Sequence, residues 1–538
     1  MQADYLLDYS GVPGGREQHL YLLARLQADT APGADTRRPL NLSLVLDRSG
    51  SMQGDKLVYV KKAAQYLVRH LGGQDRLSVV SYNEEVSVDA GSAVVAHKDQ
   101  LLRRIEDLRA GGTTNLSGGW LQGCQLVAEH SEEGQINRVL LLTDGLANQG
   151  VTEPAQLERM ARQKHHAGIT TTTMGVGLNF NEDLLTRMAA EGGGAYYFID
   201  DPDQAPVIFR EELQDLLKVV GQNFVVTLTL GDDVRMVRQL NDYPVEKQDG
   251  ALTFRMGDVF SDEVKTLLLE LAIPPLQSQG DPVEIGRLGF ELDGLNEAGT
   301  EHLVFDVPLT VEVVTRDDFK TLEREPEVVR NLLILQAARA REEAIQFADR
   351  GDFNRASQVL RASAEAIRSS DFFTEPEMRE RHDMLREESV DMELGSSRYD
   401  ARARKASMTK SHYEGTRPFG RIGETRAMHS RLKRARAAIE RRGETPGSVT
   451  WSGGTLQIED RLRIGRSDDN DITVAENEVS KYHCEVVRVG ADLLLKDLNS
   501  KNGTFANGGR VSGRFRLSVG DVVTVGSELF MFEAAQNE

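Results

Sequence analysis

Residues 44–52 read Leu-Val-Leu-Asp-Arg-Ser-Gly-Ser-Met, and this stretch decides the fold of the first part of the chain. Its apolar start is typical of a buried strand. It ends in Asp47, Ser49 and Ser51, and a glycine between the serines allows a tight turn before a helical pattern begins. In open α/β sheets ligands bind at the carboxyl ends of strands. The three oxygen-bearing side chains are therefore a candidate site for Mg²⁺, which prefers hard oxygen ligands.

Two later loops favour a ligand site over the alternative, a plain polar turn in which Ser51 or Asp55 caps the helix. The sequence Gly-Gly-Thr-Thr-Asn at 111–115 is a Gly-rich loop that opens a helix. The apolar run at 140–142 predicts a buried strand that ends in Asp144. All three loops lie at the ends of parallel-type strands, so they can converge on one edge of a sheet.

In these residues the chain resembles the von Willebrand factor type A (VWA) family, whose metal-ion-dependent adhesion site (MIDAS) uses Asp-x-Ser-x-Ser, a loop Thr and a strand-end Asp. The resemblance implies a Mg²⁺ or other divalent cation, with one coordination position open for a carboxylate of a partner protein. Thr114 matches the family's Thr-Asn-apolar context better than Thr113. The implied metal ligands are Asp47, Ser49, Ser51, Thr114 and Asp144.

Strand and helix patterns alternate over residues 41–220, which predicts a doubly wound, mostly parallel sheet with helices on both faces, as a VWA domain requires. Residues 221–320 alternate apolar and polar residues between turns, as in an antiparallel β-sandwich. We expect the N-terminal segment 1–40 to complete this sandwich with a strand at His19–Ala28, which makes the VWA domain an insertion. The alternative is an independent all-β domain.

A helical segment is predicted at 325–392, where one hairpin resembles a tetratricopeptide unit but no repeat recurs. Residues 393–447 are rich in Arg, Ser, Gly and Thr. Between Arg398 and Arg442 there are 14 Lys and Arg residues against four Asp and Glu residues, a net charge of +10. We expect a solvated basic linker. A basic tract of this kind can also dock on an acidic surface of the same chain, or on nucleic acid.

Residues 448–538 are again all-β and carry three motifs that resemble those of the forkhead-associated (FHA) domain, a β-sandwich. The motifs are Ile464-Gly465-Arg466, Ser480-Lys481-Tyr482-His483 and Asn499-Ser500-Lys501-Asn502-Gly503-Thr504. The resemblance implies binding of phosphothreonine peptides. It also implies that Gly465 and His483 are structural, with the histidine bracing the loops.

The chemistry of the motif residues fits phosphate capture. A dianionic phosphate needs a cation with planar donors, which Arg466 supplies. The Ser480 hydroxyl can donate to another phosphate oxygen, and Lys481 can add charge. The resemblance implies that Asn502 holds the peptide backbone beside the phosphothreonine and that Asn507 assists.

Composition narrows the class of protein. The chain has 538 residues, enough for several domains, and its net charge of −20 argues against a general nucleic-acid binder. It shows no signal peptide and no apolar run of roughly 18 residues for a membrane span. The two cysteines, Cys124 and Cys484, fall in different predicted domains, so no disulfide framework is expected and a cytoplasmic location fits best.

No catalytic motif is found, and the Gly-rich loop lacks the Lys-Ser/Thr of a nucleotide-binding loop. We expect a non-enzymatic cytosolic adaptor that binds a protein phosphorylated by a Ser/Thr kinase through the FHA domain and a second protein through the VWA domain. One alternative is an intramolecular switch, in which the FHA domain binds a phosphorylated threonine of the basic segment (Thr409, Thr416, Thr425 or Thr445). Another is a VWA subunit of an ATPase-containing or secretion-related assembly.

Overall fold

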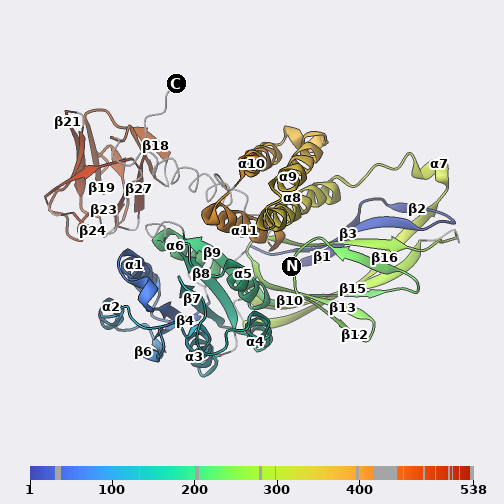
Figure 1. Ribbon diagram of the computed structural model, residues 1–538, viewed down its shortest axis with the longest axis horizontal. Coiled ribbons are helices and arrows are strands. Elements are labelled where there is room, and N and C mark those ends of the chain that lie inside the picture. Colours follow the sequence, from blue (N-terminus) through green and yellow to red (C-terminus); the bar gives the residue numbers. More distant parts are fainter. Residues whose placement is uncertain are drawn as a thin grey trace. The chain divides into compact units, whose positions relative to one another are not determined.

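The structure is a computed structural model of the 538-residue chain (Figure 1). It describes residues 1–30, 38–132, 134–199, 205–277, 282–296, 299–395, 399–416, 445–451, 454–476, 479–490, 492–506, 509–511, 513–519, 521–526 and 528–533. The chain divides into two units, Met1–Arg421 and Ile422–Glu538, and each is described by itself.

The apolar run of the decisive stretch forms the interior strand β4 (Leu40–Asp47), which is buried along its whole length. Its sheet has the order β6-β5-β4-β7-β8-β9, and only β6 runs antiparallel to its neighbour. The other strands are β5 (Arg76–Tyr82), β6 (Val86–Val94), β7 (Ile136–Thr143), β8 (Thr170–Val176) and β9 (Gly193–Ile199). This is the doubly wound sheet that the sequence predicts.

Helices cover both faces of this sheet (Figure 1) because successive β4 side chains point to opposite faces. Leu42, Leu44 and Leu46 share a core with α1, α2 and α6, whereas Val45 packs in the core formed with α3, α4 and α5. The helices are α1 (Asp55–His70), α2 (Lys98–Glu106), α3 (Leu116–Ala128), α4 (Pro154–His166), α5 (Glu182–Glu191) and α6 (Ala205–Leu216).

Two antiparallel sheets with a shared apolar core form the β-sandwich of the first unit. The four-stranded sheet contains β1 (Gln2–Leu7), β3 (Gln18–Gln27), β14 (Val264–Ile273) and β11 (Arg235–Gln239). The six-stranded sheet contains β12 (Val245–Gln248), β13 (Ala251–Phe260), β10 (Val219–Leu230), β15 (Val283–Asn296), β16 (Gly299–Val314) and β2 (Gly11–Pro13), whose pairing with β16 is parallel. The N-terminal strand β3 pairs with β14 from Gln18–Ile273 to Gln27–Val264. The α/β domain is therefore inserted between strands of one sandwich.

A helical part follows the sandwich, and its helices are α7 (Arg316–Phe319), α8 (Pro326–Asp349), α9 (Phe353–Arg368), the 3₁₀ turn η4 (Asp371–Thr374), α10 (Pro376–Glu393) and α11 (Ala401–Thr416). The prediction of a solvated linker is wrong for α11, which contacts α8, α5 and β9 (Figure 1). Four of its charged residues, Arg404, Lys405, Lys410 and Glu414, form ion pairs with the rest of the first unit, which corresponds to the docking alternative. Residues 417–444 of the predicted linker lie outside the described residues.

The second unit is a β-sandwich of two sheets, with the orders β18-β17-β27-β26-β23-β24 and β20-β19-β21-β22-β25. Its core contains Val486, Leu495, Phe530 and Phe532, all fully buried. The strands are β17 (Ser448–Trp451), β18 (Gly454–Gln457), β19 (Arg461–Gly465), β20 (Ile472–Thr473), β21 (Cys484–Val489), β22 (Asp492–Asp497), β23 (Phe505–Ala506), β24 (Gly509–Arg510), β25 (Arg514–Leu517), β26 (Val522–Val525) and β27 (Glu528–Glu533).

Both cysteines are buried core residues without a disulfide partner, one in each unit. Burial raises the pKa of each thiol to about 12, so neither is a reactive thiolate at neutral pH. Within the described part of the chain, none of the helices combines the length and the apolar character of a membrane span.

Candidate functional sites

The backbone holds the first two loops of the predicted metal site together. After β4 the chain makes one 3₁₀ turn, η2 (Gly50–Met52). The Gly50 N–H donates to the Gly112 carbonyl and the Gly111 N–H donates to the Arg48 carbonyl, each at 2.9 Å. Gly112 has φ +80°, a left-handed conformation that favours glycine. The Gly-rich loop is thereby fixed against the Asp-x-Ser-x-Ser turn.

Four of the five predicted ligands form one hydrogen-bonded cluster. The Asp47 carboxylate accepts the Ser49 N–H at 2.8 Å. The Ser49 and Ser51 hydroxyls lie 3.1 Å apart, and the Ser51 hydroxyl donates to Asp144 Oδ1 at 2.6 Å. Asp47 and Asp144 are both fully buried. The structure thus brings two carboxylates and two hydroxyls from two loops to one point at the edge of the sheet.

The two threonines of the Gly-rich loop are placed differently. Thr114 is buried, and its N–H donates to Asn148 Oδ1 at 2.8 Å. A Cβ added to Gly145 would lie 3.4 Å from the Thr114 hydroxyl and 3.5 Å from that of Ser51, so both hydroxyls border the same small space. The Thr113 hydroxyl instead donates to Gln149 Oε1, an exposed contact, at 3.0 Å. The geometry favours Thr114 as the fifth member of the cluster.

Two further residues of this cluster were not identified from the sequence. The Thr143 hydroxyl donates to Asp47 Oδ2 at 2.7 Å and so orients that carboxylate. Lys56, in the first turn of α1, forms an ion pair with Asp144 Oδ2. In the sequence these two residues are marked only by their positions. Thr143 directly precedes the predicted ligand Asp144, and Lys56 lies just after the Asp-x-Ser-x-Ser turn. Burial raises the pKa of Asp47, while hydrogen bonds from Ser49 and Thr143 oppose that shift.

The donor set of the cluster fits a hard divalent cation. Two buried carboxylates and three hydroxyls are oxygen ligands of the kind that Mg²⁺ takes, with water completing the shell. Among the described residues no group of three or more His, Cys, Asp and Glu side chains is arranged to hold a metal ion.

In the second unit His483 ties the predicted phosphate loops together. It is fully buried, its Nδ1 accepts the Ser480 N–H at 3.2 Å, and its Nε2 lies 3.1 Å from the Gly503 carbonyl. Accepting at Nδ1 leaves the proton on Nε2, which donates to that carbonyl. Gly465 is also structural, because a Cβ there would lie 2.3 Å from the Lys481 carbonyl.

The residues predicted to contact phosphate lie together on the surface. The Arg466 N–H donates to the Ser480 carbonyl at 2.9 Å, and the Arg466 side chain donates through Nε to Val479 at 3.1 Å. The Ser480 hydroxyl accepts the Lys501 N–H at 3.0 Å. Arg466, Lys481 and Lys501 are exposed around this half-buried hydroxyl. The surface therefore carries three cations about one serine.

The loop that carries Asn502 is shaped by Asp497, which the sequence analysis did not single out. Asp497 Oδ1 accepts the hydroxyls of Ser500 and Thr504, each at 2.6 Å. Although burial raises the pKa of Asp497, these hydrogen bonds lower it below its usual value. Asn502 is exposed on this loop. Asn507 lies outside the described residues.

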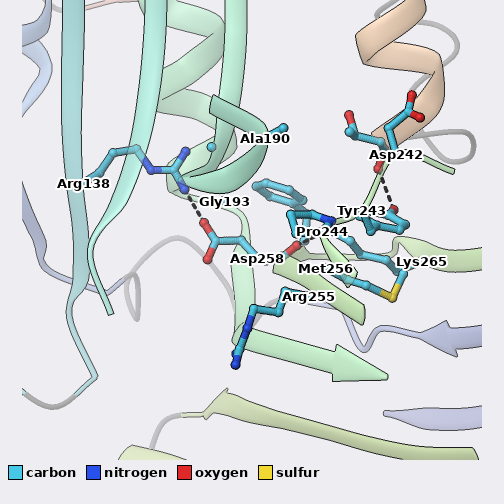
Figure 2. Close-up of a pocket in the computed structure, with 14 residues that line it drawn as sticks. Arg138, Ala190, Gly193, Asp242, Tyr243, Pro244, Arg255, Met256, Asp258 and Lys265 are labelled. Carbon is cyan, nitrogen blue, oxygen red and sulfur yellow. Dashed lines mark hydrogen bonds and ion pairs between the residues drawn. The ribbon is translucent and has the colours of Figure 1, made fainter. Parts of the chain in front are cut away.

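A cavity of about 40 Å³ in the first unit contains none of the predicted site residues (Figure 2). It is lined by the α/β domain, the sandwich and the end of α11, and has room for about one water molecule. Figure 2 shows Arg138 of β7 beside Asp258 of β13. Arg138 also pairs with Glu212 at 3.0 Å, and all three side chains are buried. This region joins the inserted domain to the sandwich.

Comparison with known proteins identifies the two domains that carry these sites. The family model of the von Willebrand factor type A domain matches residues 41–211, and that of the FHA domain matches residues 462–526. An uncharacterized Synechocystis protein, sll0103, is 30% identical over 371 residues, which is 67% of this chain and 85% of that protein. The uncharacterized protein YfbK of Escherichia coli is 33% identical over 261 residues, 47% of this chain and 44% of that protein.

Among solved structures, a von Willebrand factor type A protein from Catenulispora acidiphila covers 77% of this chain and 96% of its own length, with a TM-score of 0.59 at 16% identity. At this identity the likeness concerns the fold. The predicted combination of a VWA α/β domain with a C-terminal FHA β-sandwich is confirmed.

Proposed function

Because this chain belongs to the von Willebrand factor type A domain proteins and carries an FHA domain, we propose that it is a non-enzymatic adaptor that joins two proteins. Both domains are interaction domains. The FHA domain binds a phosphothreonine protein, and the VWA domain binds a second protein through Mg²⁺. The observation that carries the proposal is the convergence of two fully buried carboxylates and three hydroxyls at one edge of the VWA sheet.

At the VWA site the residues that hold the cation are Asp47, Ser49, Ser51, Thr114 and Asp144. Bound Mg²⁺ supplies an open coordination position for a carboxylate of the partner. The protein prepares this site: Thr143 fixes the Asp47 carboxylate, and the Gly50–Gly112 hydrogen bond fixes the loops. Burial makes each carboxylate–cation interaction stronger than it is in water.

At the FHA site the phosphate is held by Arg466, Ser480 and Lys481, and Asn502 contacts the peptide backbone, assisted by Asn507. The exposed cations favour a dianionic phosphate over a neutral threonine. The partner is therefore a substrate of a Ser/Thr kinase. The buried, unpaired cysteines support a reducing compartment such as the cytoplasm.

The proposed phosphothreonine binding by the FHA domain is tested by measuring binding of the full chain to paired peptide libraries that contain threonine or phosphothreonine. We expect selective binding of phosphothreonine that Arg466→Ala abolishes, because this removes the planar donor. Arg514→Ala, on strand β25 of the same domain, is the matched control. Equal binding of both libraries would refute the FHA part of the proposal.

The proposed Mg²⁺ binding by the VWA domain is tested by isothermal titration calorimetry of the full chain with Mg²⁺. We expect binding that Asp144→Asn removes, because one of the two carboxylates is lost. Asp107→Asn, at the end of α2, is the control. If wild type shows no heat of binding, or Asp144→Asn binds as well as wild type, the metal site is refuted.

An intramolecular switch through Thr409 would need α11 to leave its site first. Thr409 is buried, and its hydroxyl donates to the Lys405 carbonyl at 2.9 Å within the helix. Of the other threonines considered, Thr425 lies outside the described residues.

A further inference from the structure

Lys56 is held in the VWA site rather than projecting freely from α1. Its ammonium group pairs with Asp144 Oδ2, on a carboxylate that is fully buried, while its own side chain is 26% exposed. Gly177, with φ +73°, lies behind it, and a Cβ there would be 3.2 Å from Lys56 Cε. The loop after β8 therefore closes over the lysine stem, and Asp144 fixes its charged end.

This placement changes the charge that a divalent cation meets. Asp47 and Asp144 carry −2 when ionised, and Lys56 reduces the sum of the three groups to −1. The two oxygens of Asp144 are already used, Oδ1 by the Ser51 hydroxyl and Oδ2 by Lys56. A cation that binds here must share Asp144 with an ammonium group a few ångströms away. Repulsion between like charges in a site of low polarity opposes that binding.

The positive charge of Lys56 favours the binding of a carboxylate to the metal-loaded site. With a divalent cation bound, the three side chains and the ion sum to +1, whereas without Lys56 they would sum to zero. A carboxylate that arrives at the open coordination position is then attracted by the whole site and not only by the ion. Cation and carboxylate therefore favour each other's binding, which is a coupling between two ligands.

We propose that Lys56 is a specificity-determining residue that weakens the binding of Mg²⁺ alone and strengthens the binding of a partner's carboxylate to the metal-loaded site. This inference rests on the proposed metal-binding function of the VWA domain. Its consequence is that the metal binds tightly only together with an acidic partner. The VWA site is therefore occupied when the cation and the partner's carboxylate are both present, and not by the cation alone.

The experiment measures the affinity of the full chain for Mn²⁺, a paramagnetic substitute for Mg²⁺, from the electron paramagnetic resonance signal of the free ion. Titrations are made with and without acetate, which serves as the carboxylate probe. The variants are Lys56→Met, Lys56→Arg, which keeps the charge, and Lys247→Met, an exposed control on β12. Asp144→Asn reports whether Mn²⁺ occupies the site at all.

We expect Lys56→Met to bind Mn²⁺ about tenfold more tightly than wild type, and to keep only part of the gain in affinity that acetate gives wild type. Lys56→Arg and Lys247→Met should resemble wild type in both titrations. Equal or weaker Mn²⁺ binding by Lys56→Met, or an undiminished acetate effect, overturns the role of Lys56 and leaves the metal site standing. If Asp144→Asn binds Mn²⁺ as wild type does, the proposed metal site fails and the inference fails with it.

Discussion

Strand β3 and helix α11 both join parts of the first unit that lie far apart in the chain, but opposite kinds of residues hold them. β3 places Leu20, Leu22 and Leu26 in the sandwich core, where all three are fully buried. Apart from Gly415, the buried residues of α11 are polar or charged, and they include Lys405, Ser411 and Glu414. An apolar strand and a charged helix thus connect distant segments by different forces.

On one side α11 is held by the VWA domain. Lys405 donates to the Phe180 carbonyl at 2.8 Å and pairs with Glu182. Arg404 reaches Asp183 at 3.2 Å and, on α8, Asp349 at 2.8 Å. These contacts fix the start of α11 between the inserted domain and the helical part.

On the other side Glu414 joins α11 to two buried arginines, Arg341 and Arg381. Lys410 pairs with Glu388 of α10 at 2.7 Å. Buried ion pairs stabilise little relative to an apolar contact of the same shape, but the loss of one partner leaves a buried charge without compensation. The position of α11 is therefore determined by matched charges. A substitution of one of these charged residues should release α11 from its site.

Glu414→Ala should have the largest effect, because it leaves Arg341 and Arg381 short of a partner. We expect the free energy of opening of α11 to fall by about 4 kcal/mol, while the sandwich stays folded. Hydrogen–deuterium exchange of residues 401–416 measures this opening. Glu365→Ala on α9, where the glutamate is exposed, is the control. Unchanged exchange in Glu414→Ala would mean that charge does not hold α11.

Leu22→Ala tests the apolar side of the comparison. We expect it to lower the free energy of unfolding of the first unit by about 3 kcal/mol, because it leaves a cavity in the sandwich core. Urea denaturation at low and high salt measures both the loss and its salt dependence. The loss should be the same at both salt concentrations, and a strong salt dependence would contradict the distinction drawn between β3 and α11.

Raising the pH should loosen α11 through Glu342, whose carboxylate accepts the Ser411 hydroxyl at 3.0 Å. Burial, with Asp242 nearby, raises the pKa of Glu342 from 4.5 to about 7. The protonated form is therefore favoured by folding, so its stabilisation is complete below pH 4.5 and is lost as the pH rises through 7. We expect a loss of about 2 kcal/mol in the free energy of opening of α11, measured by hydrogen exchange. Glu342→Gln should remove this dependence, and a dependence that persists in that variant would refute the assignment.

Glu388 makes the stability of α11 change with pH in the opposite direction, and it does so at acid pH. Burial raises its pKa, but Arg341 and Lys410 lower it to about 2 overall. Its stabilisation is therefore present above pH 4.5 and is lost as the pH falls toward 2. Together the two carboxyls place the greatest stability of α11 near pH 4.5, because the Glu388 contribution falls below that pH and the Glu342 contribution falls above it.

Lys410→Met should have the smallest effect, because this lysine is partly exposed and Glu388 keeps its contact with Arg341. We expect a loss of about 1 kcal/mol in the opening free energy of α11, measured by hydrogen exchange. A loss as large as that of Glu414→Ala would mean that partly exposed pairs matter as much as buried ones.

The same contrast explains what could be predicted from the sequence. The strand that ends at Asp47 and the segment that forms β3 carry apolar patterns, and such patterns can be recognised within the segment itself. The FHA loops carry motifs with fixed spacing. For α11 the local pattern is polar and basic, and the acidic partners that make it fold, such as Glu182 and Glu388, lie elsewhere in the chain. Only the three-dimensional arrangement shows that these charges match.

The missed site residues have a similar cause. Thr143 and Lys56 act on the carboxylates of the VWA site through contacts that depend on how β7 and α1 meet the loops. Asp497 shapes the Asn502 loop from the end of β22. Each is a common residue type in an ordinary local sequence. Residues that belong to a family motif can be found from spacing, whereas residues that orient them become visible only in the fold.

The insertion of the VWA domain into the sandwich has a consequence for synthesis. Gln27 of β3 pairs with Val264, a residue 237 positions later in the chain. At about 5–20 residues per second, a ribosome needs roughly 10–50 s to add that partner. During this time the β1–β3 ribbon has an open edge and an uncovered apolar face, while the VWA domain completes its own sheet. The newborn chain therefore passes through a period in which it is prone to aggregation and is a natural client for a chaperone.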